Sequence, residues 1–206
     1  MTAQSPGFLG KRANQRVRRH RETHHDTAPG TVARPRALAI VAVVLGASAL
    51  IGRRNAPHPS HPRIRRWYAR LDKPAYTPPD AAFGAVWPVL EVGLAIGGYR
   101  LLRHRPAPAR STAIGLWLVN TAMIGGWTEL FFRRHALGRS TLASGAMIAT
   151  GAGYVAAAAR VDRPAAIAAV PFVAWLGFAT LLAARIWAKN PHAHPNALPH
   201  AAMPAE

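Results

Sequence analysis

The sequence predicts an all-α membrane protein, folded as a bundle of five transmembrane helices. Three observations lead to this prediction. Half of the 206 residues are hydrophobic, although the chain carries a formal net charge of +18. The charged residues lie mostly between five long apolar runs, as in proteins that cross the bilayer several times. The connections between the later runs are short, so consecutive helices should lie antiparallel and side by side.

The five apolar runs differ in length. The predicted helices are residues 37–52, 83–102, 111–132, 140–159 and 164–188. Each of the last four has at least 20 residues, enough to cross a hydrocarbon core of about 30 Å. The first has 16 residues, which rise only about 24 Å. The arginines that follow it would therefore have to extend towards the lipid headgroups.

Polar segments flank the helical domain, residues 37–188. Residues 1–36 are basic and poor in apolar side chains, which predicts a disordered arm that sets the topology or contacts anionic lipid. Residues 189–206 are rich in Pro and His and are predicted to be a disordered tail. Residues 53–82, the first loop, are predicted to be ordered and to cover one end of the bundle. Five spans would place the termini on opposite sides, but Lys and Arg are too evenly distributed to assign an orientation.

Composition and motifs exclude several classes of function. The chain has no cysteine, which rules out disulfides, thiolate metal sites and cysteine nucleophiles. The sequence contains no hydrolase triad order, phosphate-binding glycine loop, zinc-protease motif or EF-hand pattern. Its arginines bracket the apolar runs instead of clustering in one soluble segment, which argues against nucleic acid as a partner. We therefore predict no required cofactor and no conventional hydrolytic or nucleotide chemistry.

Three strings of residues carry a more specific signal. Residues 67–79 read W-Y-x-x-L-x-K-P-x-Y-x-P-P and lead into F-x-x-x-W at 83–87. Residues 127–132 read W-T-x-x-F-F, and residues 171–180 read P-F-x-x-W-x-x-F-A-T. In this order and on these predicted elements, the strings resemble the signature of the TspO/MBR family, the tryptophan-rich sensory or translocator proteins. The resemblance covers roughly residues 64–190.

The resemblance implies a five-helix bundle in a bacterial cell membrane, commonly a homodimer, with a ligand pocket between helices beneath the first loop. Family members bind porphyrins, haem and other tetrapyrroles, so such a molecule would be a ligand of this chain and not a required cofactor. Matching residues place Trp87 and Trp175 in the pocket. The candidate ligand-binding residues are Trp67, Tyr68, Pro78, Pro79, Phe83, Trp87, Glu91, Asn120, Trp127, Trp175 and Ala179.

Helical spacing agrees with this placement. Trp87 and Glu91 lie one turn apart on one face of their helix, and Trp175 and Ala179 do the same on the last helix. Two faces of this kind would offer flat walls to a planar aromatic ligand. The alternative is that tryptophans, Trp117 among them, anchor the helices at the membrane interface.

Small residues four apart, as in Gly93-x-x-x-Gly97, predict close helix packing, mostly within one chain.

Several positions depart from the residues usual in the family. Ile124 and Ala183 stand where the family has Asn, Glu91 and Phe172 where it has Tyr, and Tyr76 where it has Trp. The pocket therefore loses several hydrogen-bonding groups. Ala184 replaces the Tyr of the family's C-terminal cholesterol-recognition stretch, so steroid binding is not favoured.

Two carboxylates fall inside predicted membrane helices, where ionisable groups are costly and are functional candidates. Glu129 lies near a helix end, and its expected partner is Arg133, four residues later. Glu91 lies about two turns into its helix with no basic residue within a turn. It is expected to face the pocket.

Three functional hypotheses remain open. The leading one is a membrane-embedded binding or sensory protein for a planar hydrophobic ligand, most simply a tetrapyrrole. The second is an enzyme that promotes light-dependent porphyrin oxidation through Trp87 and Trp175. The third is a small-molecule or proton-coupled transporter that uses Glu91.

Overall fold

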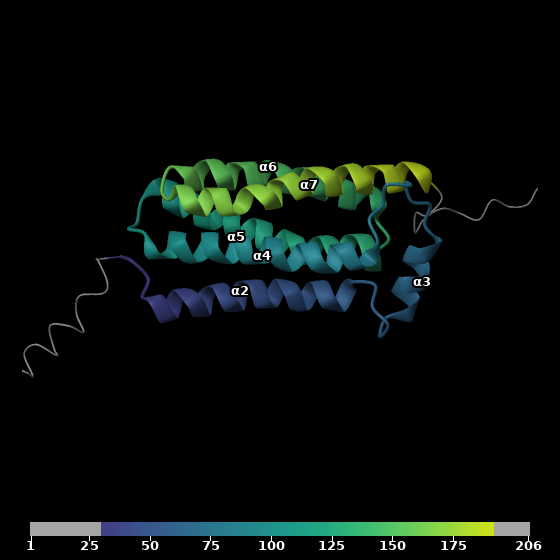
Figure 1. Cartoon of the computed structure of the whole chain (residues 1–206), viewed down its shortest axis with the longest axis horizontal. Helices are drawn as coiled ribbons and strands as arrows, with labels where there is room; N and C mark the ends of the chain where they lie inside the picture. Colours follow the sequence, from purple (N-terminus) through teal and green to yellow (C-terminus); the bar gives the residue numbers. More distant parts are fainter. Residues whose placement is uncertain (1–29, 192–206) are drawn as a thin grey trace, which may run out of the picture.

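The computed structural model describes residues 30–191, which fold as six α-helices and one π-helical turn, with no β-strand in that range (Figure 1). The helices are α2 (Arg34–Asn55), α3 (Pro62–Arg70), α4 (Asp80–Arg103), α5 (Pro108–Thr128), the π-turn η1 (Glu129–Arg133), α6 (Leu137–Ala159) and α7 (Arg163–Lys189). Five are long and run side by side, whereas α3 is short and lies at one end of the bundle. Most of the predicted arm and tail lies outside the described residues.

The five long helices form a closed ring. Helix α2 packs against α4, α4 against α7, α7 against α6, α6 against α5, and α5 back against α2. The Ser48 hydroxyl closes the last pair by donating a hydrogen bond to the Thr121 carbonyl at 2.8 Å. This order places the second and fifth predicted spans, α4 and α7, side by side. The two helices that carry Trp87 and Trp175 are therefore neighbours.

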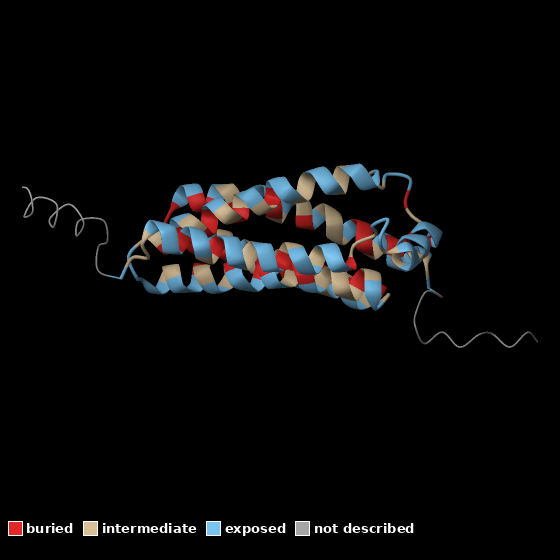
Figure 2. Ribbon diagram, turned by 90° about the horizontal axis from the view of Figure 1, so that it is seen from below, coloured by how far each residue is buried: buried red, intermediate tan, exposed pale blue. Residues whose placement is uncertain are grey.

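The helices are apolar on their outer as well as their inner surfaces. Figure 2 shows exposed residues along the outside of the bundle. Among the exposed apolar side chains are Val43, Val89, Leu142 and Ile167, each 60–73% exposed. A soluble helix would be polar there. Within the described residues, α2, α4, α6 and α7 are long and apolar enough to cross a membrane, whereas α5 is less apolar. The protein is thus an all-α membrane protein.

Helix α2 is longer than the sequence predicted. It begins at Arg34, with a proline in its first turn, and ends at Asn55 after two arginines that favour a helix C-terminus. Its 22 residues rise about 33 Å, which is enough to cross the hydrocarbon core, but the arginines occupy its terminal turns, so their side chains still have to extend towards the headgroups. The prediction ended this helix at the apolar boundary, but Arg53 and Arg54 continue it.

Large side chains and glycines interlock at the centre of the ring. Trp117 is fully buried, and its indole N–H donates to the Leu94 carbonyl at 3.0 Å, so it is a core residue and not an interface anchor. A Cβ atom at Gly93 would collide with the Ala168 carbonyl, and one at Gly97 with the Tyr154 hydroxyl. The Gly93–Gly97 pair therefore serves packing of α4 against α7 and α6 within one chain.

Candidate functional site

The first loop contains a helix that the sequence did not predict. Helix α3 and the segment that follows it, residues 62–79, lie across one end of the bundle, and we call these residues the lid. Trp67 stacks on His135 with ring centroids 4.0 Å apart and meets Phe131 edge-on at 5.9 Å. Tyr68 is buried and meets Phe131 and Phe132 edge-on. The lid is therefore fixed by aromatic contacts to η1 and the turn after it.

The π-turn η1 provides these contacts. The Arg134 N–H donates to the Glu129 carbonyl at 3.0 Å, five residues back, and this wider turn carries both Phe131 and Phe132 to the lid side. The same geometry corrects the predicted ion pair. Glu129 pairs with Arg134 at 3.4 Å and not with Arg133, because a π-turn brings residue i+5, not i+4, onto the same face.

Asn190 holds the other edge of the lid. Its side-chain amide donates to the Asp72 carbonyl at 2.9 Å and accepts from the Asp72 N–H at 3.0 Å. The sequence does not predict these contacts, because Asn190 follows the last apolar residues and lies in the predicted tail. The Lys73 ammonium lies 4.2 Å from the Tyr68 ring centroid. Burial, together with the charge of Asp80, raises the pKa of Tyr68 to about 12, so its hydroxyl stays protonated.

Aromatic side chains of α4 and α7 meet beneath the lid. Phe83 of α4 contacts Trp175 of α7 edge-on, with ring centroids 5.9 Å apart, and Trp175 contacts Phe178 at 5.2 Å. The Trp175 indole N–H is buried and has no acceptor among the described residues. The Thr180 hydroxyl is also buried and has no hydrogen-bond partner among them. A buried donor without a partner is uncommon in native proteins.

The remaining predicted site residues are less closely associated. Trp87 and Ala179 are half-buried, and Trp87 packs against the central core. Glu91 is half-buried, and no hydrogen bond or ion pair is seen for it within residues 30–191. Pro78 and Pro79 lead directly into α4, with Pro79 at its N-cap position.

Two other predicted residues make structural contacts. Asn120 is fully buried between α5 and α6, where it accepts from the Thr150 hydroxyl at 3.1 Å and donates to the Leu116 carbonyl. Trp127 stacks on Phe131 at 4.9 Å and donates to the Ser140 carbonyl. Trp127 thus packs against η1, which in turn contacts the lid.

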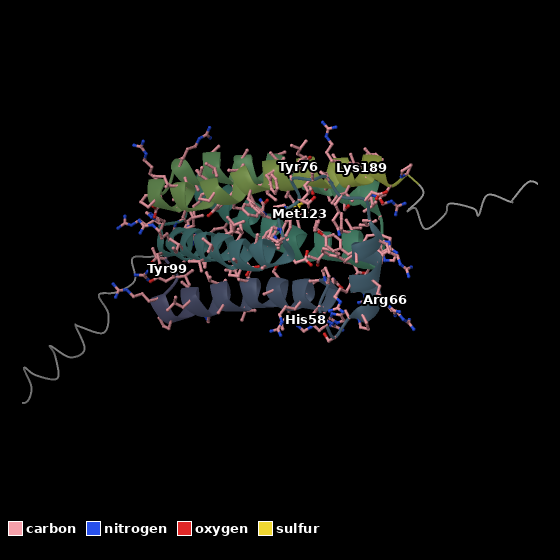
Figure 3. The ribbon with its side chains drawn as sticks, turned by 45° about the vertical axis from the view of Figure 1, so that its right-hand side comes forward. His58, Arg66, Tyr76, Tyr99, Met123 and Lys189 are labelled. Carbon is pink, nitrogen blue, oxygen red and sulfur yellow. The ribbon has the colours of Figure 1, made fainter. Side chains whose placement is uncertain are left out.

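A shallow cavity of about 390 Å³ lies where the lid meets the outer side of α7. It is lined by Pro74, Ala75, Tyr76, Leu181, Arg185 and Lys189. Figure 3 shows Tyr76 and Lys189 on the same side of the bundle, at the lid end. No cluster of residues that could hold a metal ion occurs in the described part of the chain.

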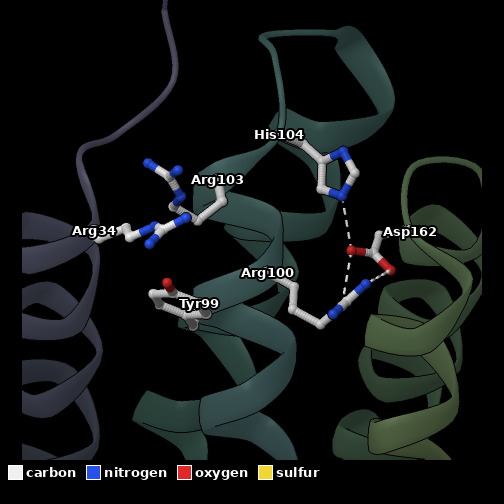
Figure 4. Close-up of a pocket in the computed structure, with 6 residues that line it drawn as sticks. All are labelled: Arg34, Tyr99, Arg100, Arg103, His104 and Asp162. Atoms are coloured by element: carbon white, nitrogen blue, oxygen red, sulfur yellow. Dashed lines mark hydrogen bonds and ion pairs between the residues drawn. The ribbon is translucent and has the colours of Figure 1, made fainter. Parts of the chain in front are cut away.

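A polar cluster of Asp162, Arg100 and His104 lies at the end of the bundle opposite the lid, and Figure 4 shows these side chains. Asp162, in the turn before α7, accepts two hydrogen bonds from Arg100, at 2.9 and 3.2 Å, and one from His104 at 2.7 Å. It also accepts from the Ala165 N–H and so caps α7. Burial alone would raise the pKa of Asp162, but these donors and the Arg100 charge outweigh it and lower the pKa below its usual value.

Comparisons with known proteins agree with this geometry. The model of the TspO/MBR family matches residues 38–188. The chain is 32% identical to the translocator protein of Bos taurus over 131 residues, which are 61% of this chain and 75% of the relative. It is 28% identical to the protein CrtK of Rhodobacter capsulatus, over 63% of this chain and 81% of the relative. It is 26% identical to the tryptophan-rich protein TspO of Bacillus cereus, over 63% and 84%.

Asp162 should make stability depend on pH. Because its pKa is lowered by folding from 3.8, its stabilising effect is complete above that value and is lost as the pH falls through the folded pKa. We expect D162N to lower the unfolding free energy at pH 7 by about 1–3 kcal/mol, since the donors of Arg100 and His104 lose a charged acceptor. Thermal unfolding of both proteins between about pH 7 and 3 measures this. The two melting temperatures should converge at low pH, and a constant difference would contradict the assignment.

Proposed function

We propose that this chain, which belongs to the TspO/MBR family, is a membrane-embedded binding or sensory protein for a planar hydrophobic ligand. The ligand class we propose is a tetrapyrrole, such as a porphyrin or haem, bound between α4 and α7 beneath the lid. We place the protein in a bacterial cell membrane as a homodimer, in line with the bacterial relatives and the family resemblance.

The observation that carries this proposal is the buried indole N–H of Trp175, which has no acceptor among the described residues. Leaving a buried donor without an acceptor costs about 1–3 kcal/mol, so its retention among Phe83 and Phe178 calls for a partner. A carboxylate or carbonyl oxygen of a ligand would satisfy it. The neighbouring rings would at the same time pack against the flat face of the ligand. A tetrapyrrole supplies both features.

The lid supports the same proposal. Its two attachments, to η1 and to Asn190, leave the segment at residues 74–76 over the cavity at the outer side of α7. The cavity lies at the lower end of the range of about 300–1,000 Å³ that ligand pockets span, so a molecule as large as a tetrapyrrole would extend beyond it. We propose that this cavity is the entrance to the site, and that the lid moves away from α7 when the ligand enters.

We propose α5 as the fifth span. Its lower hydropathy comes in part from Asn120 and Thr121, which are buried and whose side chains donate hydrogen bonds to carbonyls one turn earlier. Polar side chains that are hydrogen-bonded in this way cost less free energy to place in a bilayer than polar side chains without partners. Its outer face carries exposed Leu118 and Val119, as expected for contact with lipid.

A test of the fifth span compares reporter fusions after Arg105 and after Arg134, which flank α5. The reporters should lie on opposite sides of the membrane. Fusions after Arg134 and Arg160, which flank α6, are the matched control, because α6 is apolar enough to span by composition alone. Reporters on the same side of the membrane around α5 would exclude a five-span topology.

The ligand site is tested with the full chain in lipid nanodiscs, titrated with haem and followed by tryptophan emission. We expect W175F to weaken haem binding about three- to tenfold, because it removes one hydrogen-bond donor and keeps an aromatic ring. W187F is the matched control: Trp187 lies on the same helix but is 39% exposed on its outside. If the two variants bind haem equally well, the ligand does not contact Trp175.

Illumination of the porphyrin complex distinguishes a binding protein from a photo-oxidising enzyme. A binding protein returns the porphyrin unchanged, whereas an enzyme yields a product whose formation depends on Trp87 and Trp175. Uptake into proteoliposomes that depends on pH and on Glu91 would instead favour a transporter.

A further inference from the structure

A basic cavity of about 320 Å³ lies at the end of the bundle opposite the lid, between α2 and α4 (Figure 4). It is lined by Arg34, Tyr99, Arg100, Arg103, His104 and Asp162. Three of the six are arginines and one is a carboxylate. Nothing in the proposed tetrapyrrole site uses these residues.

The charges in this cavity are not balanced. Asp162 is engaged by Arg100 and His104, which together with the Ala165 N–H saturate the carboxylate. Arg103 donates to the Val32 carbonyl at 2.8 Å, a neutral acceptor that positions the guanidinium without compensating its charge. Arg34 is exposed, and no carboxylate contacts it within residues 30–191. In the part of the chain that the structure describes, two guanidinium groups therefore share one cavity without a counter-charge.

The cavity lies at the depth where the lipid-facing surface ends. Leu38, one turn into α2 from Arg34, is 57% exposed. On α4, Ile96 is 47% exposed and precedes Arg103 by seven residues, or about 10 Å along the helix. Exposed apolar side chains thus give way to arginine on both helices at the same end. In a bilayer this is the level of the phospholipid headgroups.

We propose that Arg34 and Arg103 bind the phosphate of an anionic phospholipid headgroup, whose acyl chains run along the exposed apolar faces of α2 and α4. Guanidinium groups match phosphate oxygens with paired hydrogen bonds, and basic pockets between membrane helices take anionic headgroups. The half-buried Tyr99 lines the same cavity and offers a hydroxyl. The site would join α2 to α4 and is independent of whether a tetrapyrrole binds at the lid end.

The test is native mass spectrometry of the full chain, titrated with phosphatidylglycerol or with zwitterionic phosphatidylcholine. Wild type should retain phosphatidylglycerol preferentially, and R34Q/R103Q should bind it about tenfold more weakly, since charge-assisted hydrogen bonds are lost. R36Q/R105Q is the matched control, because it removes two exposed arginines from the same end that do not line the cavity. The control should bind within about threefold of wild type.

Each other outcome counts against the proposal. Equal losses in the two double variants would mean diffuse attraction between basic residues and lipid, with no defined site. Displacement of phosphatidylglycerol by millimolar inorganic phosphate would assign the cavity to free phosphate, and equal retention of both lipids would exclude an anion site. If R34Q/R103Q fails to fold, R34Q alone carries the test, and an unchanged affinity in R34Q would overturn the proposal.

Discussion

The packing of Trp67 and Tyr68 against the π-turn η1 determines where the first loop lies, and the proposed site depends on it. Phe131 and Phe132 of η1 both contact Tyr68, and Phe131 also contacts Trp67. The turn after η1 holds His135 at a φ of 51°, a conformation that costs a residue other than glycine about 1–3 kcal/mol. Burial lowers the pKa of His135, so a neutral imidazole stacks on Trp67.

The two ends of the bundle are held by different interactions. At the lid end, aromatic rings and the hydrogen bonds of Asn190 fix the loop, and one indole donor beneath it has no acceptor among residues 30–191. At the opposite end, Asp162 joins α4 to the turn before α7 through charged hydrogen bonds. Helix α4 contributes Phe83 at one end and Arg100 at the other. The ion pair of Arg100 with Asp162 therefore also fixes the register of α4 against α7. The position of Phe83 relative to Trp175 follows from that register.

The sequence predicted the fold class and family because both depend on local signals. Apolar run length decides whether a segment can span a bilayer, and the prolines at 78 and 79 decide where α4 starts. Features that depend on tertiary context escaped prediction. The π-turn changes which residue pairs with Glu129, and a helical period of 3.6 cannot show it. The burial of Trp117 depends on Gly98 of a neighbouring helix, which leaves room for the indole ring. Asn190 follows the last apolar run, and only the folded lid gives it a partner.

The proposed ligand site lies against α4 and α7, beneath a lid held on η1. Hydrogen–deuterium exchange of the full chain in nanodiscs, with and without haem, locates the bound ligand. Haem should slow exchange at the ends of the lid, residues 62–79, and in the adjoining parts of α4 and α7. Exchange in the turn at residues 160–163, at the far end of the bundle, should stay unchanged. If haem binds yet leaves exchange of the lid unchanged, or protects residues 160–163 instead, the ligand does not bind beneath the lid.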